Sequence, residues 1–406
     1  LILDKNYRFV REISGFDNNG TRETFNAQQG LYVASDGSLY ICDTDNGRIV
    51  HLGADDSLIQ IYKLPTSPLL GEKYAFKPSK VAVDESGTLY VINLNEYSGL
   101  MKISPAGKFI SFIGSNKAII NPLIKIWKML MSEEQQSQML SFVPVEFKNM
   151  AMDSSGFMYT VSASVAEDNP VKRLNLSGDD ILIRSGYVDV AGDVLWTWED
   201  DASVLVDVCS AENGNYYVLD SSKGRIFTYN REGYLLYAFG GMGTQVGTFS
   251  KPCAIEQRDD TLLVLDETAA TVTVFEKTQY ADLITTAENQ YYAGEYENSL
   301  HNWEEVLKIN AYFELGYLQM GKIYLQKKNS AEAMRCFKLG NYRGDTITYM
   351  TGYNKAFTEL RKTVMGQYLG IMVGGGLVLM IGLSAFRRFR KKSRGKGAMI
   401  SDEGKA

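Results

Sequence analysis

Gly37-Ser-Leu-Tyr-Ile-Cys-Asp43 is the stretch that decides the fold, because close copies of it return four times along the chain. The copies begin at Gly87, Gly156, Gly214 and, in a decayed form, Asp260. Each copy reads as a short apolar strand that opens at a turn residue. A further alternating apolar run precedes and follows every copy. Strands at such spacing, separated by Gly, Asp and Asn turns, predict an antiparallel sheet protein built from four-stranded units.

The residues around the first copy carry a family resemblance. Asp43, Asn46 and Arg48 follow the strand as they do in the NHL repeat of β-propellers, and Asp220 with Arg225 repeats the pattern. The resemblance covers roughly residues 1–278 and implies a β-propeller, although the third and fifth units depart from the pattern. We count five units, and NHL propellers are commonly six-bladed.

Two features of the ring stay open in the sequence. A sixth, irregular blade could lie near residues 179–201. The fifth unit has no fourth strand of its own before the helical region begins. We therefore expect Tyr7–Ile13 to supply that strand and close the ring, because closure removes exposed sheet edges.

The widest gap between units holds a helical insertion at about residues 121–140. Asn121 and Pro122 form an N-cap and first-turn pair, and a capping box opens a second short helix. Trp127, Met129 and Met131 make this insertion apolar and adaptable, which is typical of surfaces that receive partners. The alternative is that the insertion folds back and covers the propeller floor.

From about residue 279 to 343 the apolar period changes from two to 3.6. Small and large residues return after 34 positions, as tetratricopeptide (TPR) repeats require: Ala287 and Gly321, Ser299 and Ala333, Trp303 and Phe337, Val306 and Gly340. The segment therefore resembles two TPR hairpins, whose repeated residues pack helices and do not bind ligands. Residues 344–386 should form a capping helix that continues into a membrane span. TPR stacks offer a groove to other proteins, and a simple spacer role is the alternative.

Val364–Phe386 contains twenty-three residues without a charge, which is long enough for one helix to cross a bilayer. Seven Lys and Arg residues follow between Arg387 and Lys396. This bias places the tail, residues 387–406, in the cytoplasm and the bulk of the chain outside. We expect a single-pass cell-membrane protein whose leader peptide has been removed.

Gly366, Gly370 and Gly374 lie four residues apart and therefore line one face of the expected membrane helix. Such spacing lets a second helix approach closely, so these glycines are candidate partner-binding residues. The alternative is that glycine is simply common in membrane helices.

Charge excludes one class of partner. The formal net charge is −6, and the tail carries eight Lys or Arg against two Asp or Glu, so residues 1–386 carry −12. An acidic domain of this kind argues against nucleic acid. The basic tail suits the anionic headgroups of the inner leaflet.

The sequence shows no catalytic constellation, and we predict neither enzymatic activity nor a cofactor or metal. The two histidines, His51 and His301, lack metal or triad companions, and the four cysteines show no metal-binding spacing. Four acidic residues near strand starts could face a propeller channel, without a sign that they converge: Glu146, Asp153, Asp207 and Glu256.

These features predict a membrane-anchored extracytoplasmic scaffold that binds membrane protein subunits through its span and ectodomain. Proteins that combine NHL, TPR and a C-terminal helix resemble accessory subunits of bacterial membrane complexes. Some of these occur near carbohydrate importers of the ATP-binding cassette (ABC) class. The alternative function is a membrane-tethered glycan-binding or lactonase-like propeller.

Overall fold

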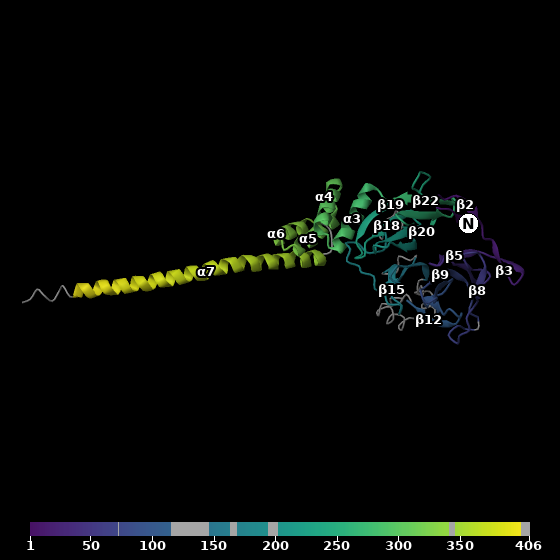
Figure 1. Ribbon diagram of the computed structural model, residues 1–406, viewed down its shortest axis with the longest axis horizontal. Helices are drawn as coiled ribbons and strands as arrows, with labels where there is room; N and C mark the ends of the chain where they lie inside the picture. Colours follow the sequence, from purple (N-terminus) through teal and green to yellow (C-terminus); the bar gives the residue numbers. More distant parts are fainter. Residues whose placement is uncertain (72, 115–145, 163–168, 194–201, 341–345, 399–406) are drawn as a thin grey trace, which may run out of the picture. The chain divides into compact units, whose positions relative to one another are not determined.

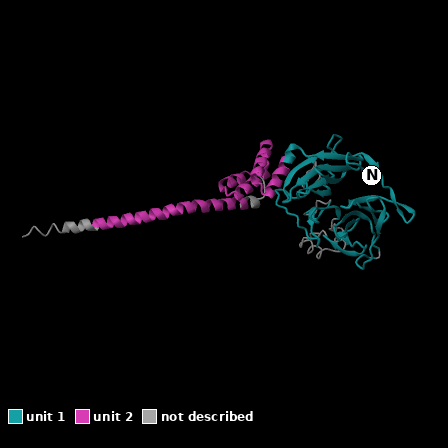
Figure 2. Ribbon diagram, in the orientation of Figure 1, with its two compact units in different colours: residues 1–282 teal, residues 283–406 magenta. Residues whose placement is uncertain are grey.

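The computed structural model describes residues 1–71, 73–114, 146–162, 169–193, 202–340 and 346–398. The chain divides into two compact units, residues 1–282 and 283–406 (Figure 2). Each unit is described by itself, with the element labels of Figure 1. The expected insertion at 121–140, with Trp127, Met129 and Met131, lies outside the described residues.

Five of the antiparallel sheets in the first unit follow one another along the chain and are the blades of a five-bladed β-propeller (Figure 1). Blade one holds β5 (Gln28–Val33), β6 (Leu39–Asp43), β7 (Arg48–Leu52) and β8 (Leu58–Tyr62). Blade two holds β9 (Pro78–Val83), β10 (Leu89–Asn93), β11 (Leu100–Ile103) and β12 (Phe109–Ile113). Blade three holds β13 (Phe147–Met152), β14 (Met158–Ser162) and β15 (Val171–Leu174).

Blade four holds β16 (Leu205–Ser210), β17 (Tyr216–Asp220), β18 (Arg225–Tyr229) and β19 (Leu235–Gly240). Blade five holds β20 (Pro252–Arg258), β21 (Thr261–Asp266) and β22 (Thr271–Glu276). The count of five confirms the sequence prediction. In residues 179–193, the described part of the expected sixth blade, only a single bridge from Asp180 to Leu174 forms, so no sixth blade appears there.

Neighbouring blades share apolar cores because the second strand of blades one to four is buried on both faces. In β10, Leu89 and Val91 pack toward blade one, whereas Tyr90 and Ile92 pack toward blade three. This is the period of two expected of a strand with a partner on each side. The repeated apolar motif therefore forms the layers between blades.

The polar residue that ends each repeat motif is a buried structural anchor. Asp43 accepts hydrogen bonds from the Asn26 backbone N–H (2.6 Å), from Asn46 Nδ2 (2.9 Å) and from Arg48 Nε (2.7 Å). Asp220 and Asp266 accept backbone N–H groups in the same way at blades four and five. In blades one, four and five, these aspartates thus accept hydrogen bonds from the backbone N–H groups just before the first strand.

Two hairpins precede blade one, and they correct one sequence prediction. β3 (Gly15–Asn18) pairs with β4 (Thr21–Thr24), and its Phe16 is buried against Ile41 of blade one. β2 (Phe9–Arg11) pairs with β1 (Ile2–Leu3), and β22 pairs only with β21 among the described strands.

The expectation that Tyr7–Ile13 would be the fourth strand of blade five is therefore wrong. The N-terminal segment contacts blades five and one through side chains instead. Arg258 of blade five lies 5.6 Å from the centre of the Tyr7 ring. On the other side, Arg11 forms an ion pair with Asp56 of blade one at 2.9 Å.

The second unit begins with two helix pairs, α3 (Gln279–Ala293) with α4 (Tyr296–Ile309) and α5 (Glu314–Gln326) with α6 (Ser330–Leu339). Residues at the 34-residue spacing are packing residues, as expected: Ala287, Ser299, Trp303 and Ala333 are all fully buried. A Cβ placed on Gly321 of α5 would lie 2.8 Å from the Phe337 ring. Glycine is needed there because the two helices approach closely.

The last helix, α7 (Thr346–Ala398), runs without a break from the helix pairs into the apolar span (Figure 1). Its start packs on α6, where a Cβ on Gly352 would also lie 2.8 Å from the Phe337 ring. Residues Thr351–Arg390 form the one candidate membrane span among the described helices, and its apolar window has no buried side chains.

Candidate functional site

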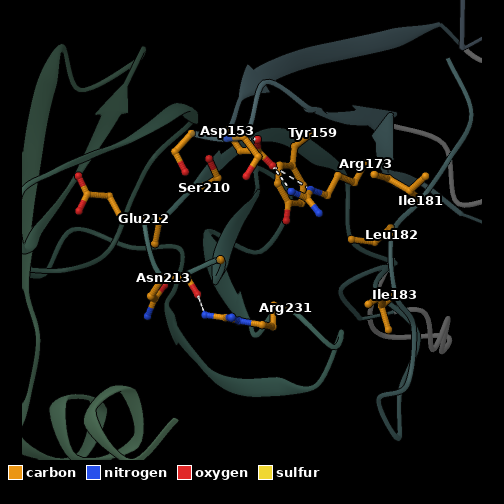
Figure 3. A pocket seen from close by; sticks show the side chains of 14 residues that line it. Asp153, Tyr159, Arg173, Ile181, Leu182, Ile183, Ser210, Glu212, Asn213 and Arg231 are labelled. Atoms are coloured by element: carbon orange, nitrogen blue, oxygen red, sulfur yellow. Dashed lines mark hydrogen bonds and ion pairs between the residues drawn. The ribbon is translucent and has the colours of Figure 1, made fainter. Parts of the chain in front are cut away.

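A pocket of about 230 Å³ lies between the turns of blades three and four (Figure 3). Its walls come from the β13–β14 turn, the segment after β15, the β16–β17 turn and the β18–β19 turn. The side chains that give it chemical character are Asp153, Tyr159, Arg173, Glu212 and Arg231.

Arg173 of β15 lies opposite Tyr159 of β14 and is held in place by Asp153. Arg173 Nε and Nη2 donate to Asp153 Oδ2 at 2.8 and 2.5 Å. The other oxygen, Asp153 Oδ1, accepts the backbone N–H groups of Ser155 (2.8 Å) and Phe157 (3.0 Å), which fixes the turn. The guanidinium also lies over two rings, 4.7 Å from the centre of Phe157 and 5.6 Å from that of Tyr159. Such contacts immobilise a cation at a wall of the pocket.

Arg231 brings a second guanidinium from the β18–β19 turn, and Gly214 makes its position possible. A Cβ on Gly214 would lie 3.3 Å from Arg231 Nε and 3.6 Å from its Cζ, and Gly214 has a φ of 84°. The arginine therefore lies against the one residue of this turn that has no side chain. Its Nη2 donates to the backbone carbonyl of Asn213.

The Tyr159 hydroxyl lies between these charged groups. In Figure 3 it points into the pocket, with the Arg173 guanidinium beside its ring and Arg231 beyond the hydroxyl. Burial raises the pKa of Tyr159 to about 12, while Arg173 and Arg231 pull it down and Asp153 pushes it up. The phenol is therefore a neutral hydrogen-bond donor at physiological pH.

A second cluster lies where the first strands of the blades run side by side. The residues that follow the bulge in each first strand occupy one register position: Gly30, Lys80, Asn149, Asp207 and Ala254. Asp207 is buried and accepts the backbone N–H groups of Val208 (2.8 Å) and Ile255 (2.7 Å). Burial raises its pKa to about 7 although these hydrogen bonds and Lys80 oppose the shift.

The four acidic residues singled out in the sequence do not form one site. Glu146 accepts the backbone N–H of Asn95 at 3.1 Å, and Asp153 belongs to the pocket. Only Asp207 and Glu256 are close enough to affect each other, since Glu256 contributes to the raised pKa of Asp207. Within the described ranges, no group of three or more His, Cys, Asp and Glu is placed to hold a metal ion.

The sequence did not single out Tyr159, Arg173 or Arg231, which give the pocket its character. Gly366, Gly370 and Gly374, which it did single out, lie on α7, and apart from the nearby backbone of that helix no described atom lies within 4 Å of where their Cβ atoms would be. Cys42, Cys209 and Cys336 are buried free thiols, and burial raises the pKa of each. These three cysteines are packing residues, whereas Cys253 is partly exposed.

No protein-family model and no curated protein matches the sequence. Among solved structures, a streptogramin B lyase is 12% identical with a TM-score of 0.36, over 61% of this chain and 68% of that chain. Virginiamycin B lyase from Staphylococcus aureus is 13% identical with a TM-score of 0.36, over 61% of this chain and 69% of that chain. A protein of unknown function from Bacteroides caccae is 11% identical with a TM-score of 0.34, over 54% and 69%. The blades themselves are assigned from strand pairing, and we infer no activity from these neighbours.

Proposed function

We propose that the chain is a membrane-anchored extracytoplasmic scaffold that holds its propeller and helix pairs beside the integral subunits of a membrane complex. The observation that carries this proposal is the continuity of α7, which leaves the packed helix pairs and becomes an apolar helix with no buried side chains in its span. An apolar surface of this length is stable only in lipid or against other membrane helices.

The glycine face supports the same role. Gly366, Gly370 and Gly374 leave open space along one side of α7, so a partner helix could approach to backbone contact. The basic residues that follow the span favour a cytoplasmic tail that contacts anionic lipid. An ABC-type carbohydrate importer is the complex named by the sequence resemblance, and that resemblance is its only support.

The test is purification of the full chain from its native membrane in a mild nonionic detergent. We expect integral membrane proteins to co-purify in fixed stoichiometry. A matched variant, with Val364–Phe386 replaced by an unrelated span free of small residues, should insert equally well but lose those partners. A chain that always purifies alone would refute the scaffold role.

A second candidate function is ligand binding by the propeller, which corresponds to the glycan-binding alternative. The pocket between blades three and four favours it, because it presents fixed charges and hydroxyl groups in a small volume. A lactonase-like activity would require turnover of lactones by the full chain. Hydrolysis that is lost when a chelator is added would establish it.

A further inference from the structure

The propeller offers an internal comparison, because four blades carry a tyrosine at the same position of the second strand. The residue opposite this tyrosine in the third strand differs from blade to blade. The pairs are Tyr40 with His51, Tyr90 with Lys102, Tyr159 with Arg173 and Tyr217 with Thr228. Blade three alone among these places a guanidinium opposite the ring.

The hydroxyl of this tyrosine is used inside blade two but not inside blade three. Tyr90 OH donates to Asp84 Oδ2 at 3.0 Å, in the turn equivalent to that of Asp153. In blade three Arg173 takes Asp153 Oδ2, so Tyr159 OH makes no hydrogen bond within the described part of the chain. Because blade three carries Arg173 where blade two carries Lys102, the Tyr159 hydroxyl faces the pocket without a partner among the described residues of its own blade.

The charges of the pocket favour a ligand with a single negative charge. Among the residues that line the pocket, the charges of Arg173 and Arg231 equal those of Asp153 and Glu212, and both guanidinium groups lie close enough to Tyr159 to oppose the rise of its pKa. Arg173 Nη1 makes no hydrogen bond to the described residues. A carboxylate suits paired guanidinium donors, whereas a doubly charged phosphate would leave excess charge near Asp153 and Glu212.

The rest of the lining suits a polyhydroxyl body of small size. The hydroxyls of Ser154, Ser155 and Ser210 make no hydrogen bonds to other described residues, while Ile181 and Ile183 provide an apolar wall. The volume of about 230 Å³ is below the range of drug-sized ligands, so it fits a single small ring.

We propose that this pocket binds a carboxylate-bearing monosaccharide unit, a hexuronate, with its carboxylate between Arg173 and Arg231 and a hydrogen bond from Tyr159. The sugar hydroxyls contact the three serines, and an apolar face of the ring packs on Ile181 and Ile183. The proposal rests on the ligand-binding candidate function and requires no membrane partner.

The test is calorimetric titration of the purified full chain, in nonionic detergent, with D-galacturonate and D-glucuronate. D-Galactose, inorganic sulfate and inorganic phosphate are titrated alongside them. At least one hexuronate should bind, and the neutral sugar and bare anions should bind at least about 10-fold more weakly, since a hydrogen bond to a charged group contributes that much. Equal affinity for galactose, tighter binding of phosphate, or no binding of either hexuronate overturns the proposal.

Variants locate the site. Tyr159→Phe should weaken hexuronate binding about 3- to 10-fold and Arg231→Gln about 10-fold or more, while Tyr90→Phe and Arg225→Gln serve as matched controls that leave it unchanged. Arg173→Lys is preferred to alanine, because the repeat already accepts Lys102 at this position and Asp153 keeps a cation. Unchanged affinity in both Tyr159→Phe and Arg231→Gln, with folding verified by circular dichroism, refutes the assignment. None of these measurements depends on co-purifying partners, so failure of the scaffold role would be seen separately.

Discussion

Replacing Asp207 by Asn should change how the stability of the propeller depends on pH. The carboxylate is buried and accepts two backbone N–H groups, one from Val208 and one from Ile255 of the next blade. Asparagine cannot ionise, and its single carbonyl oxygen can accept only part of this pair. Blade three shows the outcome, because Asn149 at the same register position accepts the Met150 N–H at 2.8 Å.

The size of the effect follows from the pKa. Burial raises the pKa of Asp207 from 3.8 to about 7, so the folded protein holds this proton more tightly than the unfolded chain does. Its contribution to the free energy of unfolding is therefore fully present below about pH 4 and is lost as the pH rises through about 7. Roughly 3 pH units at about 1.4 kcal/mol each give about 4 kcal/mol, of which roughly 2–3 kcal/mol is lost between about pH 5 and 8.

The comparison of two proteins isolates this contribution. His51 acts with the opposite sign, because burial lowers its pKa and acid therefore favours the unfolded chain, but it is the same in wild type and variant. At about pH 5 the variant should be less stable, since the Ile255 N–H loses an acceptor at a cost of about 1–3 kcal/mol. By about pH 8 this deficit should disappear or reverse.

The assay is guanidinium unfolding of the full chain in nonionic detergent, followed by the β-sheet band of the far-UV circular dichroism spectrum. The reciprocal variant Asn149→Asp should acquire a pH dependence like that of Asp207. A stability difference between wild type and Asp207→Asn that stays constant from about pH 5 to 8 would refute the reasoning.

Three further predictions concern helix packing and the N-terminal ion pair. Gly370→Ile should weaken association of α7 with a partner helix by about 1–3 kcal/mol while insertion survives, whereas Leu379→Ile, about 180° round the helix, should do less. If both variants co-purify with the same set of proteins, the glycines do not form a packing face. Gly321→Ala places a Cβ 2.8 Å from the Phe337 ring. The helical unit should therefore lose about 1–3 kcal/mol of stability and unfold at a lower temperature. An unchanged unfolding midpoint would contradict the close approach. Arg11→Ala should raise hydrogen exchange in residues 1–13 with little change in global stability, and unaltered exchange would show that the ion pair with Asp56 does not hold the hairpin.

Much of the fold could be predicted from the sequence because its signals are local and repeated. The motif that begins at Gly37 alternates with a period of two, and burial on both faces of the second strand in blades one to four is why the motif is so strongly apolar. The glycines and alanines of the helix pairs were recognisable because small residues are needed where helices approach closely, as Gly321 approaches Phe337.

Closure of the propeller could not be predicted in the same way. The segment Tyr7–Ile13 has the composition of a strand, and the sequence alone does not say which edge it pairs with. In the structure it folds back on β1 and contacts blades one and five through Arg11 and Tyr7. An ion pair and a cation–π contact between residues this distant in the chain leave no periodic signal.

The pocket was missed for a reason that lies in the register of blade three. Eleven residues separate Tyr40 from His51 and Tyr217 from Thr228, and twelve separate Tyr90 from Lys102. The same offsets from Tyr159 reach Pro170 or Val171, yet strand pairing places Arg173, fourteen residues on, opposite the ring. The connection between the second and third strands is therefore longer in blade three, and it places Arg173 opposite the tyrosine. An alignment of the repeats at a constant spacing would assign that position to Pro170 or Val171. A departure from repeat length, more than any residue type, is the sequence signal that marks where a repeated scaffold has acquired a site of its own.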